Sequence, residues 1–559
     1  MSARNRVPLD TLGAAHRGGY PSGTAQSSSE ARVWWWLVAC AGDPTGGGRS
    51  TATVADTAEL GPGPVTTHPS APLVASAAIA PTAVALAFTL TADADAPAQV
   101  TVHLDGPHGE RTLAFPDLAL THDLPLVGLR AASEYRLTIT LTASDGRSAT
   151  STLPLTTPPL PDGLPVLELR AASPDAEPGY TLFAPFRPEG GGWVVVVDDQ
   201  GQPVWVSDVG RDWRAVSWAA AGGVQGLAGD ALVEISWRGE ERARFAADGD
   251  PAIEMPRLHH EAARLPDGGW YTLTNITRRI DGMPLDYERT TFGRAPIADP
   301  TVVRLAADGT TVASWSLAER LDPHRLGWNA LDLDGGRLDW GHANAVVPVQ
   351  GGFLVALRHQ DAVVRVDEDS GEIRWILANP DGWPEALQPL LLRADGPLTW
   401  PAHAHAPELS ADGRLLLFDN RNDGGSTPYS PDAGGPERSR IVEFAVDEAA
   451  GTVRQTWAWS ATPAGELFST ALGDADRLPG GTVLASFAFL FVEDGIPNPE
   501  RGRGNRSVRL FEVDPATDAV LWDLAVWDTA EHAPLGWQLD RAARIGALYP
   551  PEVVDSGWR

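Results

Sequence analysis

The stretch 363–377, VVRVDEDSGEIRWIL, decides the fold because it recurs along the chain in altered form. It joins an apolar strand to a second strand that ends near a tryptophan, through a turn that carries aspartate and glycine. Clear further copies occupy 193–209, 301–317, 441–459 and 508–524, and a looser copy occupies 232–249. Hairpins repeated every few tens of residues are typical of a β-propeller, in which each copy supplies the outer strands of one blade. Six copies therefore predict six blades.

The residues before the first copy divide into three further regions. Residues 72–160 contain short alternating runs, such as EYRLTITLTASDG, which predict a small fibronectin-III-like β-sandwich. Residues 41–71 are rich in glycine, proline and threonine and predict a flexible tether. We therefore expect an all-β protein with a leader at 1–40, the sandwich at 72–160, and the six-bladed β-propeller at 163–559.

Composition narrows the classes of function. The 559 residues include 73 acidic and 43 basic residues, a formal net charge of −30, and all the basic residues are arginines. We expect no nucleic-acid partner, because an acidic chain lacks the basic footprint that phosphate backbones require. An anionic small molecule needs only a local cluster of arginine and histidine, so it remains compatible with this charge. No run of 18 or more apolar residues predicts a transmembrane helix.

The single cysteine, Cys40, ends a short apolar run within RVWWWLVACAGDPTGGGRS, residues 32–50. One cysteine excludes an internal disulfide and a cysteine-rich metal site. The run is similar to the lipobox of bacterial lipoproteins, in which the cysteine accepts lipid and anchors the mature chain. We therefore expect lipidation at Cys40, membrane attachment through this lipid alone, and a location in the bacterial cell envelope. The alternative is a disordered leader with a chance apolar patch.

A second repeat precedes several hairpins and carries histidine. HEAARLPDGGWYTLTN starts at His260, HANAVVPVQGGFLVALR at His342 and HAPELSADGRLLLFDN at His405. Equivalent positions on different blades converge on the mouth of the channel, so we expect the three imidazoles to share a pocket. Related segments without histidine, such as 473–487, indicate that the scaffold does not require histidine there. This favours a functional role for the three.

Two neighbouring histidines leave their orientation open. His259 precedes His260, and on a strand one of the two points into the channel and the other away; alignment of the repeats selects His260. His403 lies two residues before His405, which on a strand would place both side chains on one face. The sequence does not decide between His403 and His405.

Four blocks of sequence resemble, in order and approximate spacing, the bacterial arylsulfate sulfotransferases. They are DWGHANAV (339–346), LRHQDAVVRVDEDSGEIRWIL (357–377), HAPELSADGRLLLFDN (405–420) and SRIVEFAVDEAAGTVRQTWAW (439–459). The resemblance covers roughly residue 163 to the carboxyl end and implies a six-bladed propeller behind an amino-terminal sandwich. It implies transfer of a sulfuryl group from an aryl sulfate to a phenol in the cell envelope. No metal, other cofactor or adenylyl-sulfate donor is implied.

The resemblance also assigns roles to residues. It implies that His405 is the nucleophile that forms a transient sulfohistidine, and that His260 and His342 surround the sulfuryl oxygens. Asn344 and Arg358 would complete the anion clamp, and one protonated histidine would act as general acid and base. Further candidates for substrate binding are His259, His403 and Asn420.

The chain departs from the family pattern at two positions besides the paired histidines. Ala404 stands where the family usually has glutamine, and Arg421 where it usually has glycine. These changes bear on the choice of acceptor and on activity.

Two other functions compete with sulfuryl transfer. The same three histidines could bind a divalent metal in a hydrolase, although no carboxylate occupies an equivalent position. Alternatively, the propeller could bind sulfated or phenolic ligands, or another protein, without turnover. The family includes homodimers, and the sequence leaves the oligomeric state and the natural donor and acceptor open.

Overall fold

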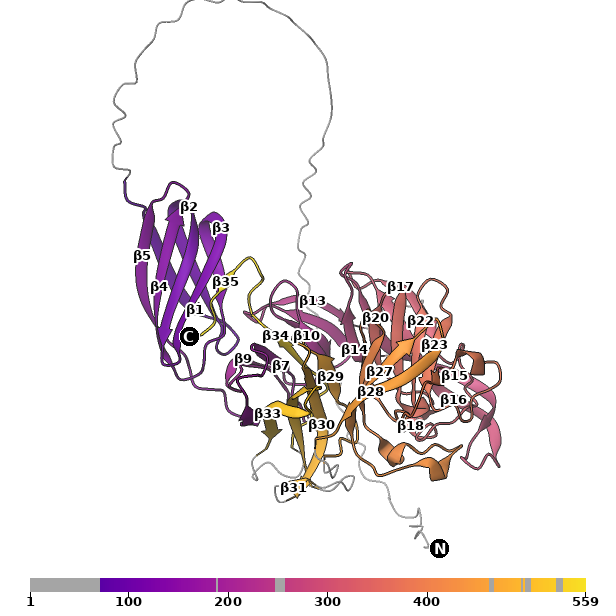
Figure 1. Ribbon diagram of the computed structural model, residues 1–559. Helices are drawn as coiled ribbons and strands as arrows, with labels where there is room; N and C mark the ends of the chain where they lie inside the picture. The colour runs from indigo at the N-terminus through magenta and orange to yellow at the C-terminus, as the bar shows by residue number, and fades with distance from the viewer. Residues whose placement is uncertain are drawn as a thin grey trace, which may run out of the picture. The chain divides into compact units, whose positions relative to one another are not determined.

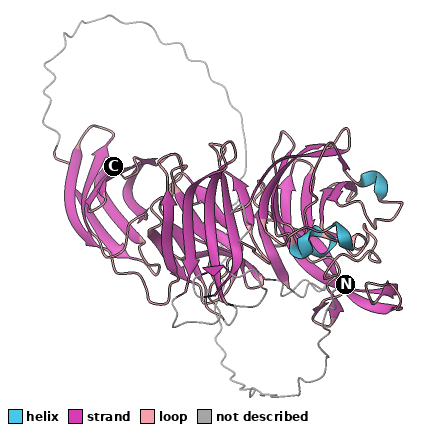
Figure 2. Ribbon diagram, turned by 60° about the horizontal axis from the view of Figure 1, so that its bottom comes forward, coloured by secondary structure: helices cyan, strands magenta, loops and turns pink. Residues whose placement is uncertain are grey.

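Six β-sheets follow one another around a propeller in the computed structural model, which describes residues 71–187, 190–246, 257–461, 467–493, 496–497, 504–528 and 536–558. Four 3₁₀ turns are the helical elements of this part of the chain. They are η1 (Arg358–Gln360), η2 (Gln388–Leu390), η3 (Asn422–Gly425) and η4 (Pro431–Ala433). Figure 2 shows how strands dominate the structure. The all-β, six-bladed prediction is confirmed.

The blades are numbered here in chain order. Blade 1 contains β7 (Tyr180–Phe183), β8 (Trp193–Val197), β9 (Pro203–Asp208) and β34 (Ala542–Ile545). Blade 2 contains β10 (Trp213–Trp218), β11 (Val224–Ala228), β12 (Ala231–Ile235) and β13 (Glu241–Ala246). Blade 3 contains β14 (Leu258–Arg264), β15 (Trp270–Pro284), β16 (Phe292–Leu305), β17 (Thr311–Ser316), β18 (Leu333–Asp334) and β19 (Arg337–Leu338).

Blades 4 to 6 complete the ring. Blade 4 contains β20 (Ala343–Val349), β21 (Gly352–Leu357), β22 (Ala362–Asp367) and β23 (Ile373–Ala378). Blade 5 contains β24 (Arg393–Ala394), β25 (His405–Leu409), β26 (Arg414–Asp419), β27 (Arg440–Asp447) and β28 (Thr452–Trp459). Blade 6 contains β6 (Val166–Ala172), β29 (Asp474–Arg477), β30 (Val483–Glu493), β31 (Ile496–Pro497), β32 (Asn505–Asp514) and β33 (Ala519–Trp527).

Two strand exchanges close the ring. Strand β34, from the carboxyl-terminal part of the chain, pairs with β7 as the inner strand of blade 1 (Figure 1). Strand β6, which precedes blade 1 in the chain, pairs with β33 as the outer strand of blade 6. Because each end of the propeller sequence completes the sheet at the other end, both terminal blades gain their missing edge strands.

Blades pack through apolar faces that are covered on both sides. All five residues of β8 are buried, as expected for a continuous apolar run between two layers. Tryptophans join neighbouring blades: Trp315 of blade 3 lies 5.0 Å from Phe353 of blade 4, measured between ring centroids. Trp459 of blade 5 lies 5.5 Å from Phe511 of blade 6. The tryptophan at the end of a repeated hairpin therefore packs blade against blade.

The sandwich is one sheet folded on itself, with β1 (Ala75–Pro81), β2 (Phe88–Gly106), β3 (Gly109–Leu126), β4 (Glu134–Ala143) and β5 (Ser148–Thr156). The long strand β2 pairs with β1 along its first half and with β4 along its second half. Its register with β3 shifts between Asp93 and Val100, where the strand bends from one layer to the other. Alternate residues of β2 and β4 are buried, which is the period-two pattern of the sequence.

The carboxyl-terminal residues return to the sandwich, although the sequence placed all of 163–559 in the propeller. Strand β35 (Val554–Asp555) pairs with β3. Asp555 accepts two hydrogen bonds from the buried guanidinium of Arg111, at 2.9 and 2.6 Å. The indole of Trp237 in the propeller donates to the carbonyl of Leu548 at 3.0 Å. This segment therefore joins sandwich and propeller.

Two expectations concern residues before 71. The leader with Cys40 and most of the tether at 41–71 lie outside the described residues. Among the residues described, no helix has the length and apolar character needed to cross a bilayer.

Candidate functional site

The inner strands of the blades, whose neighbours contact one another around the channel, are irregular at the functional residues. Register shifts interrupt β10, β14, β20 and β25 near their amino ends. His260, His342 and His403 all have positive φ, at 62°, 46° and 56°. A non-glycine residue in this region is strained, and such strain concentrates at functional sites. The histidines are thus held in conformations that a regular strand would not give.

His259 and His260 both line the same pocket, which differs from the predicted alternation. A bulge lies between His259 and Ala262, and the backbone of His260 is in the left-handed region. Side chains therefore do not alternate between faces along this part of β14. Their Nδ1 atoms are 2.8 Å apart and share one hydrogen. Burial and neighbouring positive charge hold the pKa of His260 well below its usual value, and burial lowers the pKa of His259 to about 4. Both rings are therefore neutral near pH 7.

His342 is fixed by a carboxylate that the sequence analysis did not single out. Its Nδ1 lies 2.5 Å from Oδ2 of Asp339. The ring of His342 lies 5.2 Å from that of His260 and 4.5 Å from that of His359, measured between centroids. Because Nδ1 faces a carboxylate, it carries a proton, and Nε2 is the nitrogen that can gain or lose one.

His405 has the tautomer that a nucleophile requires. Its Nδ1 lies 2.6 Å from Oδ1 of Asn420 and 3.2 Å from the carbonyl of His403. The amide nitrogen of Asn420 donates to the carbonyls of Ser469 and Leu472 at 2.7 and 3.0 Å, which fixes Oδ1 toward the imidazole. Nδ1 therefore donates its hydrogen to two acceptors, and the lone pair lies on Nε2.

Burial and charge keep His405 neutral. Burial, followed by the positive charge of Arg358, holds its pKa well below the usual value, although the bond to Asn420 opposes this shift. A neutral imidazole is the nucleophilic form. The site thus holds His405 ready for attack at neutral pH.

Arg358 and Asn344 stand between blades near His405. The two terminal nitrogens of Arg358 lie 2.9 Å from Nε2 of His359 and 3.3 Å from the carbonyl of Thr470, which precedes β29 of blade 6. Asn344 donates to the carbonyl of Ala404 at 2.9 Å, and its buried Oδ1 has no hydrogen-bond partner among the described residues. Among neighbouring charges, the guanidinium of Arg358 contributes most to lowering the pKa of His405.

His403 does not share a face with His405. It precedes β25, its backbone is left-handed, and its backbone N–H donates to Asp361 at 2.8 Å. Its Nε2 lies 3.0 Å from Oδ1 of Asn329 in a loop of blade 3, and its side chain is completely buried. The same-face prediction fails because the strand begins only at His405. His403 thus fastens a loop, and its ring lies 6.1 Å from that of His359, measured between centroids.

The two departures from the family pattern have structural consequences. Arg421 has φ 53°, a conformation that glycine adopts without strain. Its guanidinium donates to the carbonyl of Gly424 at 2.6 Å and ties down the η3 loop. Ala404 leaves its carbonyl to Asn344. Glycine at 421 would thus relieve strain but lose this hydrogen bond.

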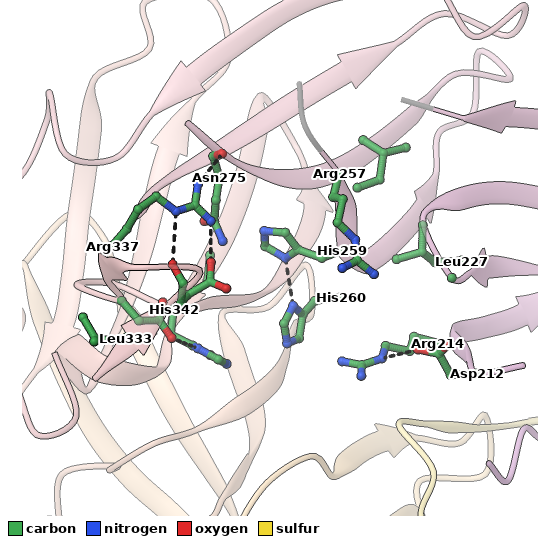
Figure 3. Close-up of a pocket in the computed structure, with 15 residues that line it drawn as sticks. Asp212, Arg214, Leu227, Arg257, His259, His260, Asn275, Leu333, Arg337 and His342 are labelled. Carbon is green, nitrogen blue, oxygen red and sulfur yellow. Dashed lines mark hydrogen bonds and ion pairs between the residues drawn. The ribbon is translucent and has the colours of Figure 1, made fainter. Parts of the chain in front are cut away.

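The main pocket lies between blades 2 and 3, with a volume of about 410 Å³, within the range typical of ligand sites. Figure 3 shows His259, His260 and His342 facing it, with Arg214 and Arg257 beyond the paired histidines. His405 is not among the residues that line this pocket, so the pocket brings together two of the three imidazoles that we expected to share it. Three arginines and three aspartates are among its lining residues: Arg214, Arg257, Arg337, Asp212, Asp334 and Asp339. The sequence analysis missed all six, because none falls on the repeated histidine position and the aspartate of DWGHANAV was quoted without a role.

A metal ion does not fit these residues well. The predicted trio of His260, His342 and His405 is not the group of ligand atoms that the described residues bring together. That group is Asp339, His342 and His359. Nδ1 of His359 lies 2.6 Å from the carbonyl of Asp339, and its Nε2 accepts from Arg358. Both ring nitrogens of His359 are thus occupied, and Nδ1 of His342 is bound to Asp339, so neither imidazole offers this group a free lone pair.

Carboxyl groups and one arginine line the channel along the inner strands. Arg541 binds Glu261 of blade 3 through two hydrogen bonds, at 3.2 and 2.6 Å. Burial and the neighbouring Asp476 hold the pKa of Asp474 well above its usual value. Burial and the charge of Glu408 raise the pKa of Asp476 to about 7. The channel therefore holds carboxyl groups protonated at mildly acidic pH.

Asp476→Asn is expected to stabilise the protein more at pH 8 than at pH 5. The folded state holds the Asp476 proton up to about pH 7, whereas the unfolded chain releases it near pH 4. The stability contributed by this group is complete below pH 4 and is lost as pH rises through 7. Between pH 5 and pH 8 about two pKa units of this loss remain, so at 1.36 kcal/mol per unit the difference between variant and wild type grows by at most about 3 kcal/mol.

Denaturant unfolding at both pH values measures this effect. Asp369→Asn is the control, because this exposed turn residue makes no side-chain hydrogen bond among the described residues. Equal stabilisation by Asp476→Asn at both pH values would contradict the prediction.

Two family profiles match the sequence of this chain. The sequence profile of the arylsulfotransferase (ASST) family matches residues 173–538, which is more than half of the chain. The chain belongs to the arylsulfotransferase family. A second profile, the arylsulfotransferase Ig-like domain, matches residues 73–158, the sandwich of this arylsulfotransferase family member. The family resemblance inferred from the four sequence blocks is thereby confirmed.

Individual relatives match over shorter stretches. The chain is 31% identical over 157 residues to the arylsulfate sulfotransferase AssT of Escherichia coli O6:H1, and 28% identical over 157 residues to that of Lelliottia amnigena. Each alignment spans about 25% of this chain and 25% of the relative. A solved protein of unknown function from Bacteroides caccae aligns over 66% of this chain and 99% of its own, with 14% identity and a TM-score of 0.38. A score this low adds no argument.

Proposed function

We propose that this protein is an aryl sulfotransferase that moves a sulfuryl group from an aryl sulfate to a phenol through a sulfohistidine at His405. The observation that carries the proposal is the fixed tautomer of His405, whose Nδ1 is bound to Asn420 at 2.6 Å. A free Nε2 in a buried site beside a guanidinium suits attack on a sulfur that carries anionic oxygens. Family membership supports the same reaction class.

The first step transfers the sulfuryl group to the protein. Nε2 of His405 attacks the sulfur, an N–S bond forms, and the bond from sulfur to the aryl oxygen breaks. The electron pair leaves on that oxygen, which takes a proton from Nε2 of protonated His342. Asp339 at 2.5 Å balances the positive charge on His342 before this proton leaves. We assign stabilisation of the sulfuryl oxygens to Arg358, whose charge acts on His405, and to the second amide hydrogen of Asn344, which bonds to the neighbouring Ala404.

The second step reverses the first with a new phenol. The acceptor hydroxyl gives its proton to Nε2 of His342 as its oxygen attacks the sulfur. The N–S bond breaks and its electron pair returns to Nε2 of His405. Both histidines regain their starting protonation states, so the cycle needs no co-reactant.

Mass spectrometry after incubation with p-nitrophenyl sulfate tests the proposal. Without acceptor, we expect one sulfuryl group on the peptide that contains His405 and a burst of one equivalent of p-nitrophenol. Added phenol should remove the adduct and restore steady turnover. Turnover without any adduct, or an adduct that phenol does not discharge, would contradict the two-step transfer.

The competing functions predict different results in the same assay. A metal-dependent hydrolase would lose p-nitrophenol release on treatment with chelator and would not need phenol. A binding propeller without turnover would retain p-nitrophenyl sulfate and release no p-nitrophenol. Cell-envelope location and the lipid anchor at Cys40 remain proposals that radiolabelled palmitate incorporation in a Cys40→Ala comparison would test.

A further inference from the structure

The wall of the pocket beyond His259 and His260 carries arginines that the transfer steps do not use. Arg214 lies on β10 of blade 2, and Arg257 directly precedes β14 of blade 3. Figure 3 shows both guanidinium groups on the side of the histidine pair away from His342. The paired histidines therefore stand between these arginines and His342, the proposed general acid.

The third arginine of the pocket is already occupied. Nη2 of Arg337 lies 2.5 Å from Oδ2 of Asp334. Its Nη1 lies 3.4 Å from the carbonyl of Asn275 and 3.4 Å from the hydroxyl of Thr277. Because both terminal nitrogens have acceptors, Arg337 acts as a fixed wall of the pocket.

Arg214 and Arg257 keep their terminal nitrogens available. Arg214 meets Asp212 through Nε at 3.4 Å, and this is its one side-chain ion pair among the described residues. The exposed side chain of Arg257 has no hydrogen bond or ion pair within the described part of the chain. Both available guanidinium groups therefore line the same pocket as the paired histidines.

The charge of Arg214 reaches the histidine pair. It contributes, after burial and the neighbouring imidazole, to the lowered pKa of His260, and it also lowers that of His259. The guanidinium therefore stands close enough to act on anything bound against these rings. A planar guanidinium fork binds carboxylate or sulfonate through two parallel hydrogen bonds.

We propose that Arg214 and Arg257 form a second anion site that binds an acidic substituent on the aryl ring of the substrate. The sulfuryl group lies at His405 and Arg358, the ring lies across His260 and His342, and the acidic group meets the two arginines. This inference rests on the proposed function for the position of the sulfuryl group. It makes doubly anionic aryl sulfates, and phenols with an acidic substituent, the favoured substrates.

Matched donors test the site during turnover. 4-Carboxyphenyl sulfate and 4-carbamoylphenyl sulfate have similar shape but differ by one charge. We expect kcat/KM for the carboxylate to exceed that for the amide by about tenfold in the wild type. Arg257→Met and Arg214→Met should each reduce this ratio severalfold. 4-Hydroxybenzoate and 4-hydroxybenzamide make the same comparison on the acceptor side.

The control is Arg279→Met, which removes an exposed arginine of β15 that does not line the pocket. It should leave the carboxylate-to-amide ratio at its wild-type value. A charge dependence in the donor or the acceptor series, lost with either arginine, supports the site. Ratios near one in the wild type, or ratios unchanged in both variants, overturn it.

Calorimetry separates failure of the site from failure of the proposed function. 4-Sulfobenzoate and 4-carbamoylbenzenesulfonate are aryl sulfonates that cannot transfer a sulfuryl group. We expect the first to bind about tenfold more tightly than the second, with the difference lost in Arg257→Met. This difference in a protein without turnover would refute the transferase and retain the anion site. Equal binding in the wild type would refute the anion site whatever the turnover.

Discussion

Replacing His405 with asparagine is expected to reduce sulfuryl transfer from p-nitrophenyl sulfate to phenol by roughly 10⁴-fold or more. Asparagine keeps a polar group of similar reach but has no nucleophilic nitrogen at neutral pH. The covalent adduct should disappear with the activity, because Nε2 of His405 is the atom that would carry it. Stopped-flow release of p-nitrophenol and mass spectrometry of the intact protein measure both effects.

His403→Asn is the matched control, two residues away in the chain. Its ring contacts Asn329, Asp361 and His359, whereas Asn420 binds His405. We expect this variant to retain the adduct and to lose much less activity, although its melting temperature should fall because a buried ring is replaced. Retention of full transfer by His405→Asn, or loss of the adduct only in His403→Asn, would show that His405 is not the nucleophile.

The six hairpins could be predicted because each has a local signature. The alternation of apolar residues and the turn of aspartate and glycine set the strand pair at 363–377 without help from distant residues. Ring closure has no such signature. Strands β6 and β34 are short segments that become strands because they pair with β33 of blade 6 and β7 of blade 1. Pairing partners separated by most of the chain leave no mark in a local pattern.

The orientation of the site histidines could not be predicted for a related reason. Face assignment along a strand assumes strict alternation. Bulges at His259 and His405, and left-handed backbone at His260 and His403, cancel that assumption where the chemistry occurs. Such strain persists because surrounding blades fix it, and tertiary contacts of this kind do not show in the sequence. The grouping of His260 with His342 followed from the repeat, whereas their exact contacts did not.

Arg214 illustrates what a search for repeated residue types misses. It lies on the inner strand of blade 2, which carries no histidine, so a search for repeated histidines does not find it. The ring symmetry nevertheless brings its guanidinium to the same pocket as His260. Sites at the axis of a propeller therefore draw on every blade, including blades whose repeat has a different residue type.

Asp339→Asn is expected to slow transfer by about 10³-fold, more for phenyl sulfate than for p-nitrophenyl sulfate. The carboxylate fixes the Nδ1–H tautomer of His342 at 2.5 Å and balances the imidazolium that would protonate the leaving oxygen. Asparagine can accept the same hydrogen bond but supplies no negative charge. The p-nitrophenolate ion leaves without help from a proton, whereas the phenolate of phenyl sulfate requires one. The kinetic loss should therefore rise with the pKa of the departing phenol.

Asp334→Asn makes the same change of charge within the same pocket, at the partner of Arg337. If Asp339 acted only by maintaining the pocket's charge or shape, the two variants would lose similar activity and neither would depend on the leaving group. We expect Asp334→Asn to lose at least tenfold less, with equal effects on both donors. If His342 protonates the departing oxygen, loss of the Asp339 charge must weaken this proton transfer, and most strongly for the more basic leaving group. An unchanged dependence of rate on the leaving group in Asp339→Asn would therefore show that His342 does not protonate the departing oxygen.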